Sequence, residues 1–245
     1  MIKIKKLYEQ DDLLVISKPI GIAAHKGADR VSYTVTDWLV DQYPQIKELN
    51  WRTENRIGIV HRLDKDTSGV MILAKKPEVI DFLQNQFRKR EVEKHYLTLV
   101  YSKPPFESGT INAKIYRDPK NRKGQKVELL DFGLYNFPRK FSATLYKTIQ
   151  RYKYKGEILT LLEINLKTGR KHQIRAHMKY ENCPVIGDQM YFNKPSKRLS
   201  KTLGLDRQFL HSNYIQFKDK TGETIEIKDE LPDDLSVLLK KLEKV

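Results

Sequence analysis

The sequence has very little cysteine and no long apolar run. Cys183 is the only cysteine among 245 residues, which excludes an internal disulfide and leaves no thiolate cluster for zinc. No stretch comes near the roughly 20 consecutive apolar residues that a membrane-spanning helix needs. Residues 1–14 contain lysines but no apolar core of signal-peptide length. A protein that works in the reducing cytoplasm, away from the membrane, is therefore expected.

Several common catalytic motifs are also missing. The sequence has no glycine-rich phosphate loop, and Ser68 does not stand in the Gly-x-Ser-x-Gly elbow of a hydrolase. His172 and His177 are five residues apart, whereas zinc ligands on a helix are four apart. The acidic residues that follow His61 lack the further carboxylates of an oxygen shell for a divalent ion. A metal-dependent nuclease therefore ranks last among the functions considered.

Acidic residues are fewer than basic ones. Lysine and arginine total 46 against 31 aspartates and glutamates, which gives a net charge of +15. Basic side chains displace condensed counterions from a phosphate backbone, so this excess favours a nucleic acid as partner. Lysines that only keep the chain in solution would give the same total. Apolar residues at 39% and charged residues at 31% are typical of a globular chain.

The apolar pattern predicts an α+β fold, with a central, mainly antiparallel mixed sheet flanked by helices and loops. The expected strands are 13–17, 57–60, 70–74, 94–101, 109–116, 141–149, 157–166, 209–217 and 223–228. The expected helices are 32–42 with a Ser32 cap, one that begins at Pro77, 171–180 and 232–243. The polar stretch 118–126 is expected to be a surface loop. Without a repeat or a clear linker, residues 1–245 are expected to form one domain.

The densest group of polar residues is GIVHRLDKDTSG, at 58–69, between two apolar segments. Rigid strands on both sides of a polar loop are typical of a functional site. Asp64 or Asp66 could instead cap local backbone amides in a tight turn, since Asp, Thr, Ser and Gly are common turn residues. The residues alone favour neither interpretation, and they do not distinguish between the two aspartates.

Two further segments carry candidate site residues. In LKTGRKHQIRAH, at 166–177, basic side chains gather at a predicted helix N-terminus, where backbone amides also attract anions. Arg175 is the candidate there to hold a catalytic carboxylate ionised, although a solvated basic helix end is the simpler alternative. In EKHYL, strand alternation turns Tyr96 away from His95 and Leu97, towards a position where it could stack on a base. A tyrosine that merely packs on the sheet is the more common case.

Taken in order, these segments resemble the RluA-type pseudouridine synthase family over nearly the whole chain. The matching segments are LYEQDDLLVISKPIGIAAH (7–25), GIVHRLDKDTSGVMILAKK (58–76), EKHYLTLV (93–100), LKTGRKHQIRAHM (166–178), NCPVIGDQMY (182–191) and FLHSNYIQF (209–217). HRLD-x-x-TSG is highly specific, and GR-x-HQIR-x-H strengthens the match. The resemblance implies an enzyme that flips a uridine out of structured RNA and isomerises it to pseudouridine.

The resemblance also implies residue roles. Asp64 corresponds to the essential carboxylate at the sugar of the target uridine, Arg175 to its partner and Tyr96 to the aromatic ring on the base. Arg62 corresponds to a position that can reach into the RNA. The pocket residues implied are Thr67, Ser68, Gly169, Ile174 and Leu210. Whether Asp64 attacks the anomeric carbon or removes a proton from the neighbouring ribose carbon stays open, and no cofactor or metal is implied.

The expected partner is structured RNA, either ribosomal or transfer RNA. Many relatives carry an additional N-terminal RNA-binding domain, whereas here the first motif begins near residue 7, so the catalytic domain itself is expected to bind RNA. The expected RNA contacts are His61, Arg62, Thr67, Ser68, Arg170, His172, Lys120, Arg122, Lys123 and Lys126, with a second basic segment at Lys194, Lys197, Arg198, Lys201 and Arg207. A monomer is the default expectation. The rival hypothesis is a non-catalytic RNA-binding assembly factor that keeps the fold.

Overall fold

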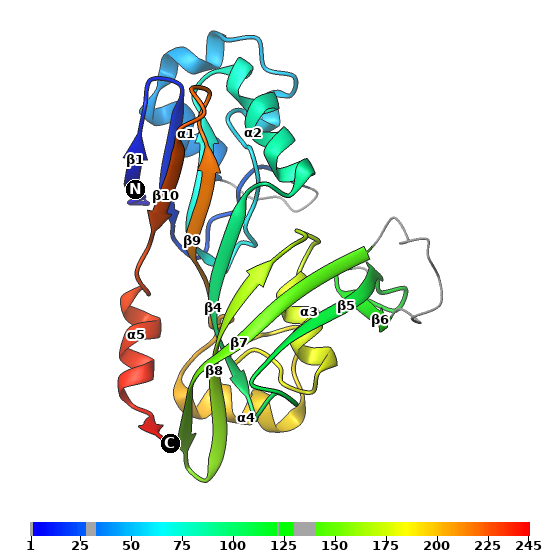
Figure 1. Cartoon of the computed structure of the whole chain (residues 1–245). Coiled ribbons are helices and arrows are strands. Elements are labelled where there is room, and N and C mark those ends of the chain that lie inside the picture. Colours follow the sequence, from blue (N-terminus) through cyan, green and yellow to red (C-terminus); the bar gives the residue numbers. More distant parts are fainter. Residues whose placement is uncertain (1, 28–32, 122, 130–140) are drawn as a thin grey trace. The chain divides into compact units, whose positions relative to one another are not determined.

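The computed structural model describes residues 2–27, 33–121, 123–129 and 141–245, and the chain divides into two compact units. Unit 1 is Met1–Lys94 with Ser212–Glu230, and unit 2 is His95–His211 with Leu231–Val245. The boundaries between the units fall inside two strands, β4 (Glu93–Tyr101) and β9 (Leu210–Lys218) (Figure 1). Whether residues 1–245 act as one domain stays a prediction.

The described residues of unit 1 form a sheet with two α-helices. Its strands follow the order β1-β2-β3-β9, and β10 pairs with β9. The further strand bounds are β1 Lys5–Glu9, β2 Leu13–Lys18, β3 Ser68–Ala74 and β10 Thr224–Lys228. The helices are α1 Val35–Gln42 and α2 Pro77–Lys89, with short 3-10 turns at Pro44–Glu48 and Glu54–Arg56.

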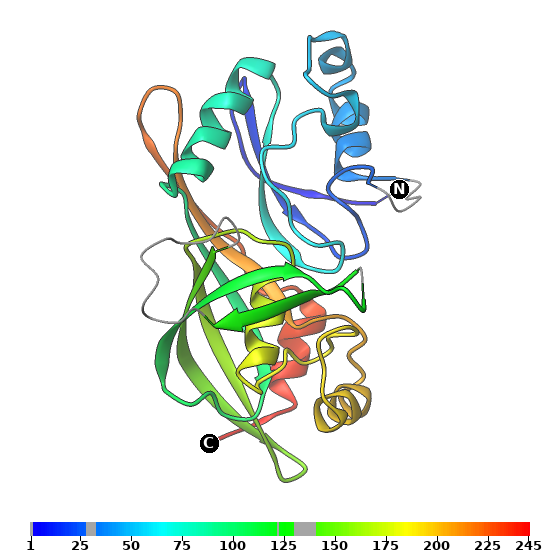
Figure 2. The ribbon, with the colours of Figure 1, turned by 90° about the vertical axis from the view of Figure 1, so that its right-hand side faces the viewer.

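Strands β2 and β3 are buried on both faces, which explains their unbroken apolar sequences. On one face, Val15 and Ile72 pack in a core with Val79 and Leu83 of α2. Figures 1 and 2 show α1 and α2 on either side of these strands. Because β3 is held in this core, the polar segment directly before it has a rigid base.

Unit 2 contains a second set of strands, in the order β4-β8-β7-β5-β6, and β11 pairs with β7. The further strand bounds are β5 Ser108–Arg117, β6 Gln125–Leu129, β7 Phe141–Tyr154, β8 Glu157–Leu166 and β11 Glu243–Lys244. The helices are α3 Gln173–Tyr180, α4 Lys194–Leu203 and α5 Asp233–Lys240. The side chain of Gln173 anchors α3 to β7, since its amide donates to the carbonyl of Ala143 at 3.0 Å and to Thr144 Oγ1 at 2.8 Å.

The predicted α+β class is confirmed, and antiparallel pairs predominate in both units. The predicted strand at 57–60 is wrong. These residues form a turn with a single bridge between Ile59 and Leu73, because Gly58 adopts a left-handed conformation with φ of 72°. Strands β1, β6 and β11 and helix α4 were not predicted. Strand β6 begins at Gln125, inside the expected surface loop, and the expected helix 232–243 ends at Lys240, before β11.

The start of α1 also differs from the prediction. Ser32, the expected cap, lies outside the described residues. Thr34 caps the helix instead: its Oγ1 accepts the N–H of Asp37, and the Asp37 carboxylate accepts the N–H of Thr34 at 2.9 Å. This reciprocal capping box satisfies two amides that the first turn would leave unpaired. Among the described residues, no helix is both long enough and apolar enough to span a membrane.

Candidate active site

Asp64 lies in a tight turn directly before β3. The N–H of Thr67 donates to the carbonyl of Asp64 at 3.1 Å, which closes the turn. The turn leaves the Asp64 side chain half-buried and that of Arg62 exposed, while Thr67 and Ser68 are buried. The backbone therefore forms the turn that was considered from the sequence, and the same turn presents an acidic side chain.

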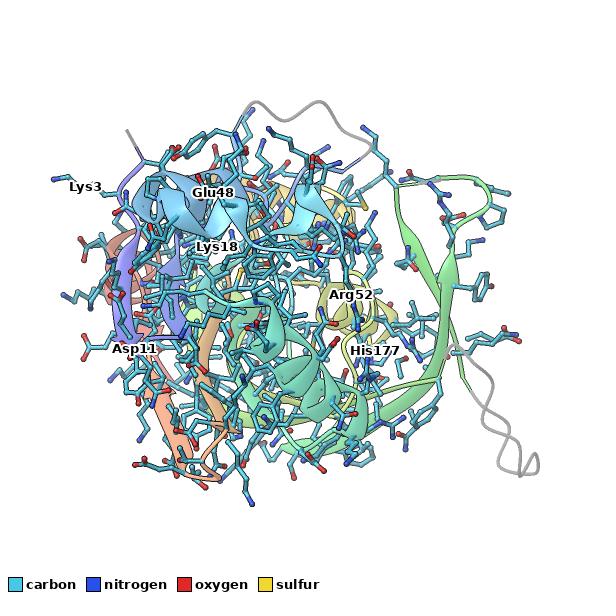
Figure 3. All side chains as sticks on the ribbon, turned by 90° about the horizontal axis from the view of Figure 1, so that it is seen from above. Lys3, Asp11, Lys18, Glu48, Arg52 and His177 are labelled. Atoms are coloured by element: carbon cyan, nitrogen blue, oxygen red, sulfur yellow. The ribbon has the colours of Figure 1, made fainter. Side chains whose placement is uncertain are left out.

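A buried lysine fixes this turn. The ammonium of Lys18 donates to the carbonyls of Pro19 at 2.8 Å, Ile22 at 3.1 Å and Lys65 at 3.0 Å. The N–H of Gly21 donates to the same Lys65 carbonyl at 3.1 Å. Lys18 lies among packed side chains, whereas Lys3 extends away from the ribbon (Figure 3). The three carbonyls replace the water that would otherwise solvate the Lys18 ammonium. Through the bond to the Lys65 carbonyl, Lys18 connects the end of β2 to the residue that follows Asp64.

Sequence reasoning missed Lys18. The expected strand at 13–17 ends directly before Lys18, although a lysine that continues an apolar strand is a signal worth testing. A second feature of this region is Gly69, with φ of 117°, where an added Cβ would lie 2.2 Å from the backbone oxygen of Ser212. Only glycine allows the start of β3 to approach β9 so closely, which accounts for the glycine of the TSG motif.

His61 is held in a neutral form beside the turn. Its ring stacks on Phe87 with 4.7 Å between centroids, and its Nε2 accepts the N–H of Ile72 at 2.9 Å. Burial, followed by the nearby positive charge of Lys94, lowers the pKa of His61 to about 3. Nε2 is therefore occupied by its hydrogen bond within the protein. A contact of His61 with RNA stays a prediction, and it would use another part of the ring.

In unit 2, Arg175 is held by a carboxylate that sequence reasoning gave no role. Its Nε donates to Asp188 Oδ2 at 2.7 Å and its Nη2 to Asp188 Oδ1 at 2.9 Å. Asp188 Oδ1 also accepts the N–H groups of Met190 at 2.8 Å and Tyr191 at 2.9 Å. The guanidinium lies over the Tyr191 ring, 5.2 Å from its centroid. This bidentate pairing fixes the plane of the Arg175 side chain.

The signal for Asp188 was present in the segment NCPVIGDQMY. An acidic residue inside an otherwise buried segment needs a partner, and its own carboxylate is completely buried. The sequence could not show that the partner is Arg175, thirteen positions earlier.

Other predicted residues in unit 2 surround the start of α3. His172 adopts a left-handed conformation at the N-cap, and its Nδ1 lies 3.0 Å from the Tyr191 hydroxyl. Arg170 is exposed, and its Nε donates to the carbonyl of Phe141 at 3.1 Å. Gly169 is exposed, whereas Ile174 is buried. The N-terminal end of α3 thus holds several of the predicted cations and two predicted pocket residues, Gly169 and Ile174.

The two remaining predicted residues of the pocket lie on strands. Tyr96 on β4 is buried, and its neighbours His95 and Leu97 are more exposed, so the predicted alternation is confirmed. Leu210, the first residue of β9, is buried. Tyr96, Leu210 and Arg175 belong to unit 2, whereas Asp64 belongs to unit 1. The pairing of Asp64 with Arg175 stays a prediction.

Two buried groups of unit 2 titrate far from neutrality. His177 Nε2 donates to the Ser142 hydroxyl at 2.9 Å, which itself donates to the Ala113 carbonyl, and burial lowers the pKa of His177 to about 4. Burial, and then the charge of Glu181, raises the pKa of the Cys183 thiol to about 11. Both groups are therefore uncharged at neutral pH.

The predicted basic surfaces are present in part. Lys120, Lys123 and Lys126 are exposed, and Arg122 lies outside the described residues. Helix α4 has an exposed basic face made of Lys194, Lys197, Arg198 and Lys201. The prediction that Arg207 extends this surface is wrong, because its buried guanidinium makes two hydrogen bonds with Asp234, at 2.8 and 2.9 Å. The part of the chain that the structure describes contains no group of three His, Cys, Asp or Glu residues that could hold a metal ion.

Comparison with known proteins decides the family. The profile of the family described as RNA pseudouridylate synthase matches residues 12–180, which include the Asp64 turn and the Arg175 helix. The chain belongs to this family. Members of the RNA pseudouridylate synthase family are isomerases, and the resemblance found in the sequence is confirmed.

Similar proteins agree with this family. A protein of Bacillus subtilis named as the uncharacterized RNA pseudouridine synthase YlyB is 34% identical over 97% of this chain and 72% of its own length. The ribosomal large subunit pseudouridine synthase D of Xanthomonas campestris is 35% identical over 98% of this chain and 70% of its own length. Among solved structures, the human RNA Pseudouridylate Synthase Domain Containing 1 has a TM-score of 0.75 at 23% identity, covering 99% of this chain and 89% of its own. The RNA pseudouridylate synthase fold is thus shared with a distant protein.

Proposed function

We propose that this protein isomerises specific uridines in structured RNA to pseudouridine, with Asp64 as the catalytic carboxylate. The observation that carries the proposal is the turn that presents Asp64, which is fixed by Lys18 through the carbonyl of Lys65 at 3.0 Å. A catalytic group must be held within a fraction of an ångström of its working position, and this buried charge provides such support. The family profile covers this turn.

The chemistry fits a single carboxylate. Breaking the glycosidic bond builds positive charge on the ribose, which Asp64 would stabilise as an ion pair or trap covalently. The freed uracil must then rotate and reattach through carbon, so a closed pocket that keeps it from leaving is required. No step of this reaction needs a redox cofactor or a nucleotide cofactor.

We further propose that Arg175 and Tyr96 act on the same uridine, Arg175 beside the Asp64 carboxylate and Tyr96 against the base. The support for Arg175 is its fixed guanidinium, and the support for Tyr96 is its buried position on β4. Ile174, Leu210 and Gly169 would complete the pocket. The RNA contacts proposed with them are Arg62, His61, Thr67, Ser68, Arg170, His172, Lys120, Arg122, Lys123 and Lys126.

The test is Asp64→Asn, which removes the charge at nearly constant volume. Tritium release from RNA labelled at carbon 5 of uridine should fall to background, while binding to the same RNA changes little. Asp66→Asn is the matched control, since it alters the same turn and should keep its activity. Full activity in Asp64→Asn would remove Asp64 from this role. If cells that lack this gene have a growth or assembly defect, and expression of the Asp64→Asn variant restores them, the non-catalytic assembly factor would be favoured instead.

Ribosomal RNA is the first substrate to test, because several relatives at 35% identity are named for the large ribosomal subunit. Transfer RNA is the second. Mapping pseudouridine in both RNAs, in cells with and without this gene, should show one or a few sites that disappear. We propose a cytoplasmic monomer, which light scattering would support with a mass near 28.8 kDa.

A further inference from the structure

A pocket with a volume of about 540 Å³ opens on unit 1 beside the Asp64 turn. Its volume lies within the range of roughly 300–1,000 Å³ that is typical of small-ligand sites. The pocket lies entirely within unit 1 and shares His61 and Arg62 with the segment that leads to Asp64. It is lined by His25, Asn50, Trp51, Arg52, Thr53, Arg56, Ile59, Val60, His61, Arg62, Pro77, Glu78, Ile80, Asp81 and Gln84.

The charges that line the pocket favour an anion. Arg52, labelled in Figure 3, donates to Asp81 at 2.7 Å, so these two charges offset each other. Arg56 and Arg62 are exposed, and neither makes an ion pair within the described ranges. Two guanidinium groups thus face a single further acid, Glu78. Guanidinium groups of this kind pair readily with phosphate.

The pocket also has a rigid aromatic wall. Trp51 is half-buried, and its indole Nε1 donates to the carbonyl of Ile46 at 2.6 Å. Trp51 packs against the hydrophobic core of unit 1, as Ile80 does. The indole is therefore fixed before any ligand arrives, as a platform for base stacking requires.

We propose that this pocket binds one nucleotide of the substrate RNA that flanks the target uridine. Its phosphate lies against Arg56 and Arg62, and its base lies against Trp51. Arg62 lines the pocket and stands two residues before Asp64 in the chain, so the pocket lies beside the turn that presents Asp64. The inference rests on the proposed function and adds to it a second recognition site, which makes the enzyme sensitive to a neighbouring nucleotide.

The test uses the two tryptophans as built-in probe and control. Trp38 lies buried on α1 and outside the pocket, whereas Trp51 lines it. The full-length chain is labelled with nitrogen-15 and its NMR spectrum is recorded as penta-uridylate RNA is added. The indole N–H resonance of Trp51 should shift, and that of Trp38 should stay unchanged. Arg56→Gln should weaken the affinity measured from this shift about tenfold, the effect of one lost charged hydrogen bond. Arg88→Gln, an exposed arginine of α2 outside the pocket, should change it less than about twofold.

Three outcomes would overturn the inference. The Trp51 signal could stay in place at saturating RNA, Arg88→Gln could weaken binding as much as Arg56→Gln, or inorganic phosphate alone could reproduce the whole shift, which would leave a simple anion site. Pseudouridine formation by the unchanged protein is assayed in parallel. An active enzyme whose Trp51 signal does not respond rejects the pocket alone, whereas a shifted Trp51 signal without pseudouridine rejects the proposed reaction alone.

Discussion

At the scale of single residues, the buried charges of this protein hold loops in place. Lys18 is surrounded by three carbonyls, and Arg175 is paired with Asp188. A buried ion pair adds little net stability compared with apolar residues of the same size, but the loss of one partner is costly. Both charges therefore act mainly by fixing the geometry of their neighbours.

Asp188→Asn should lower kcat by roughly ten- to a hundredfold and change KM much less. The amide cannot hold the guanidinium of Arg175 through two charged contacts, and a small misplacement of a catalytic group is enough to cause such a loss. Steady-state tritium release at a series of RNA concentrations gives kcat and KM. Asp206→Asn, which changes an exposed acid of the same unit, should behave like the unchanged protein. Equal loss in both variants would contradict a positioning role for Asp188.

His61 should make the protein less stable in acid. Its pKa is about 3 when folded, against an ordinary value of 6.5, so the unfolded chain binds the extra proton between these values. The free energy of unfolding should therefore fall as the pH decreases from about 6.5 towards 3, by up to about 1.4 kcal/mol per pH unit for one such histidine. Urea unfolding of His61→Gln, whose amide oxygen can still accept the Ile72 N–H, should show a shallower slope. An unchanged slope would disprove this assignment.

At the scale of elements, the close approach of β3 to β9 depends on Gly69. In Gly69→Ala, the new methyl group would lie 2.2 Å from the backbone oxygen of Ser212, so one strand must shift. We expect the free energy of unfolding to fall by about 3 kcal/mol or more. Gly21→Ala is the control, since Gly21 also has positive φ but nothing lies within 4 Å of an added Cβ. It should cost only about 1 kcal/mol, and similar losses in urea titrations of both variants would rule out the steric explanation.

The elements that could be predicted from the sequence are those with strong apolar patterns. Strands β2 and β3 and helix α2 were predicted because their buried residues are consecutive or recur at helical spacing. Strand β1, KKLYE, was missed because it is a largely exposed edge strand. Helix α4 was missed because its sequence, KPSKRLSKTL, buries only four residues.

Only those parts of the site that lie within one continuous segment of the sequence could be predicted. The motif around Asp64 is continuous in sequence, and so is the helix that contains Arg175. The contacts that hold these residues join separate parts of the chain, as the bond from Lys18 to Lys65 does. Such pairings leave no periodic signal, and the sequence alone therefore gave no role to Lys18 or Asp188.

At the scale of the whole molecule, the net charge of +15 should make RNA binding strongly dependent on salt. Each phosphate contact adds about 0.9 to the slope of log affinity against log salt for a duplex. Changing Lys194, Lys197 and Lys201 of α4 to Gln should reduce that slope by about 2 to 3. The same charge change at Lys240, Lys241 and Lys244, exposed residues near the C-terminus, is the control. A flat salt response, or an equal change in both variants, would count against α4 as an RNA surface.

The buried thiol of Cys183 has a practical consequence for experiments. Since this thiol is 2% exposed and has a pKa near 11, it reacts slowly with maleimides and disulfide reagents in the folded protein. A cysteine introduced on the surface would therefore take up a dye or spin label selectively, with the natural cysteine left in place. Labelled RNA could then be followed along either unit without first building a cysteine-free protein.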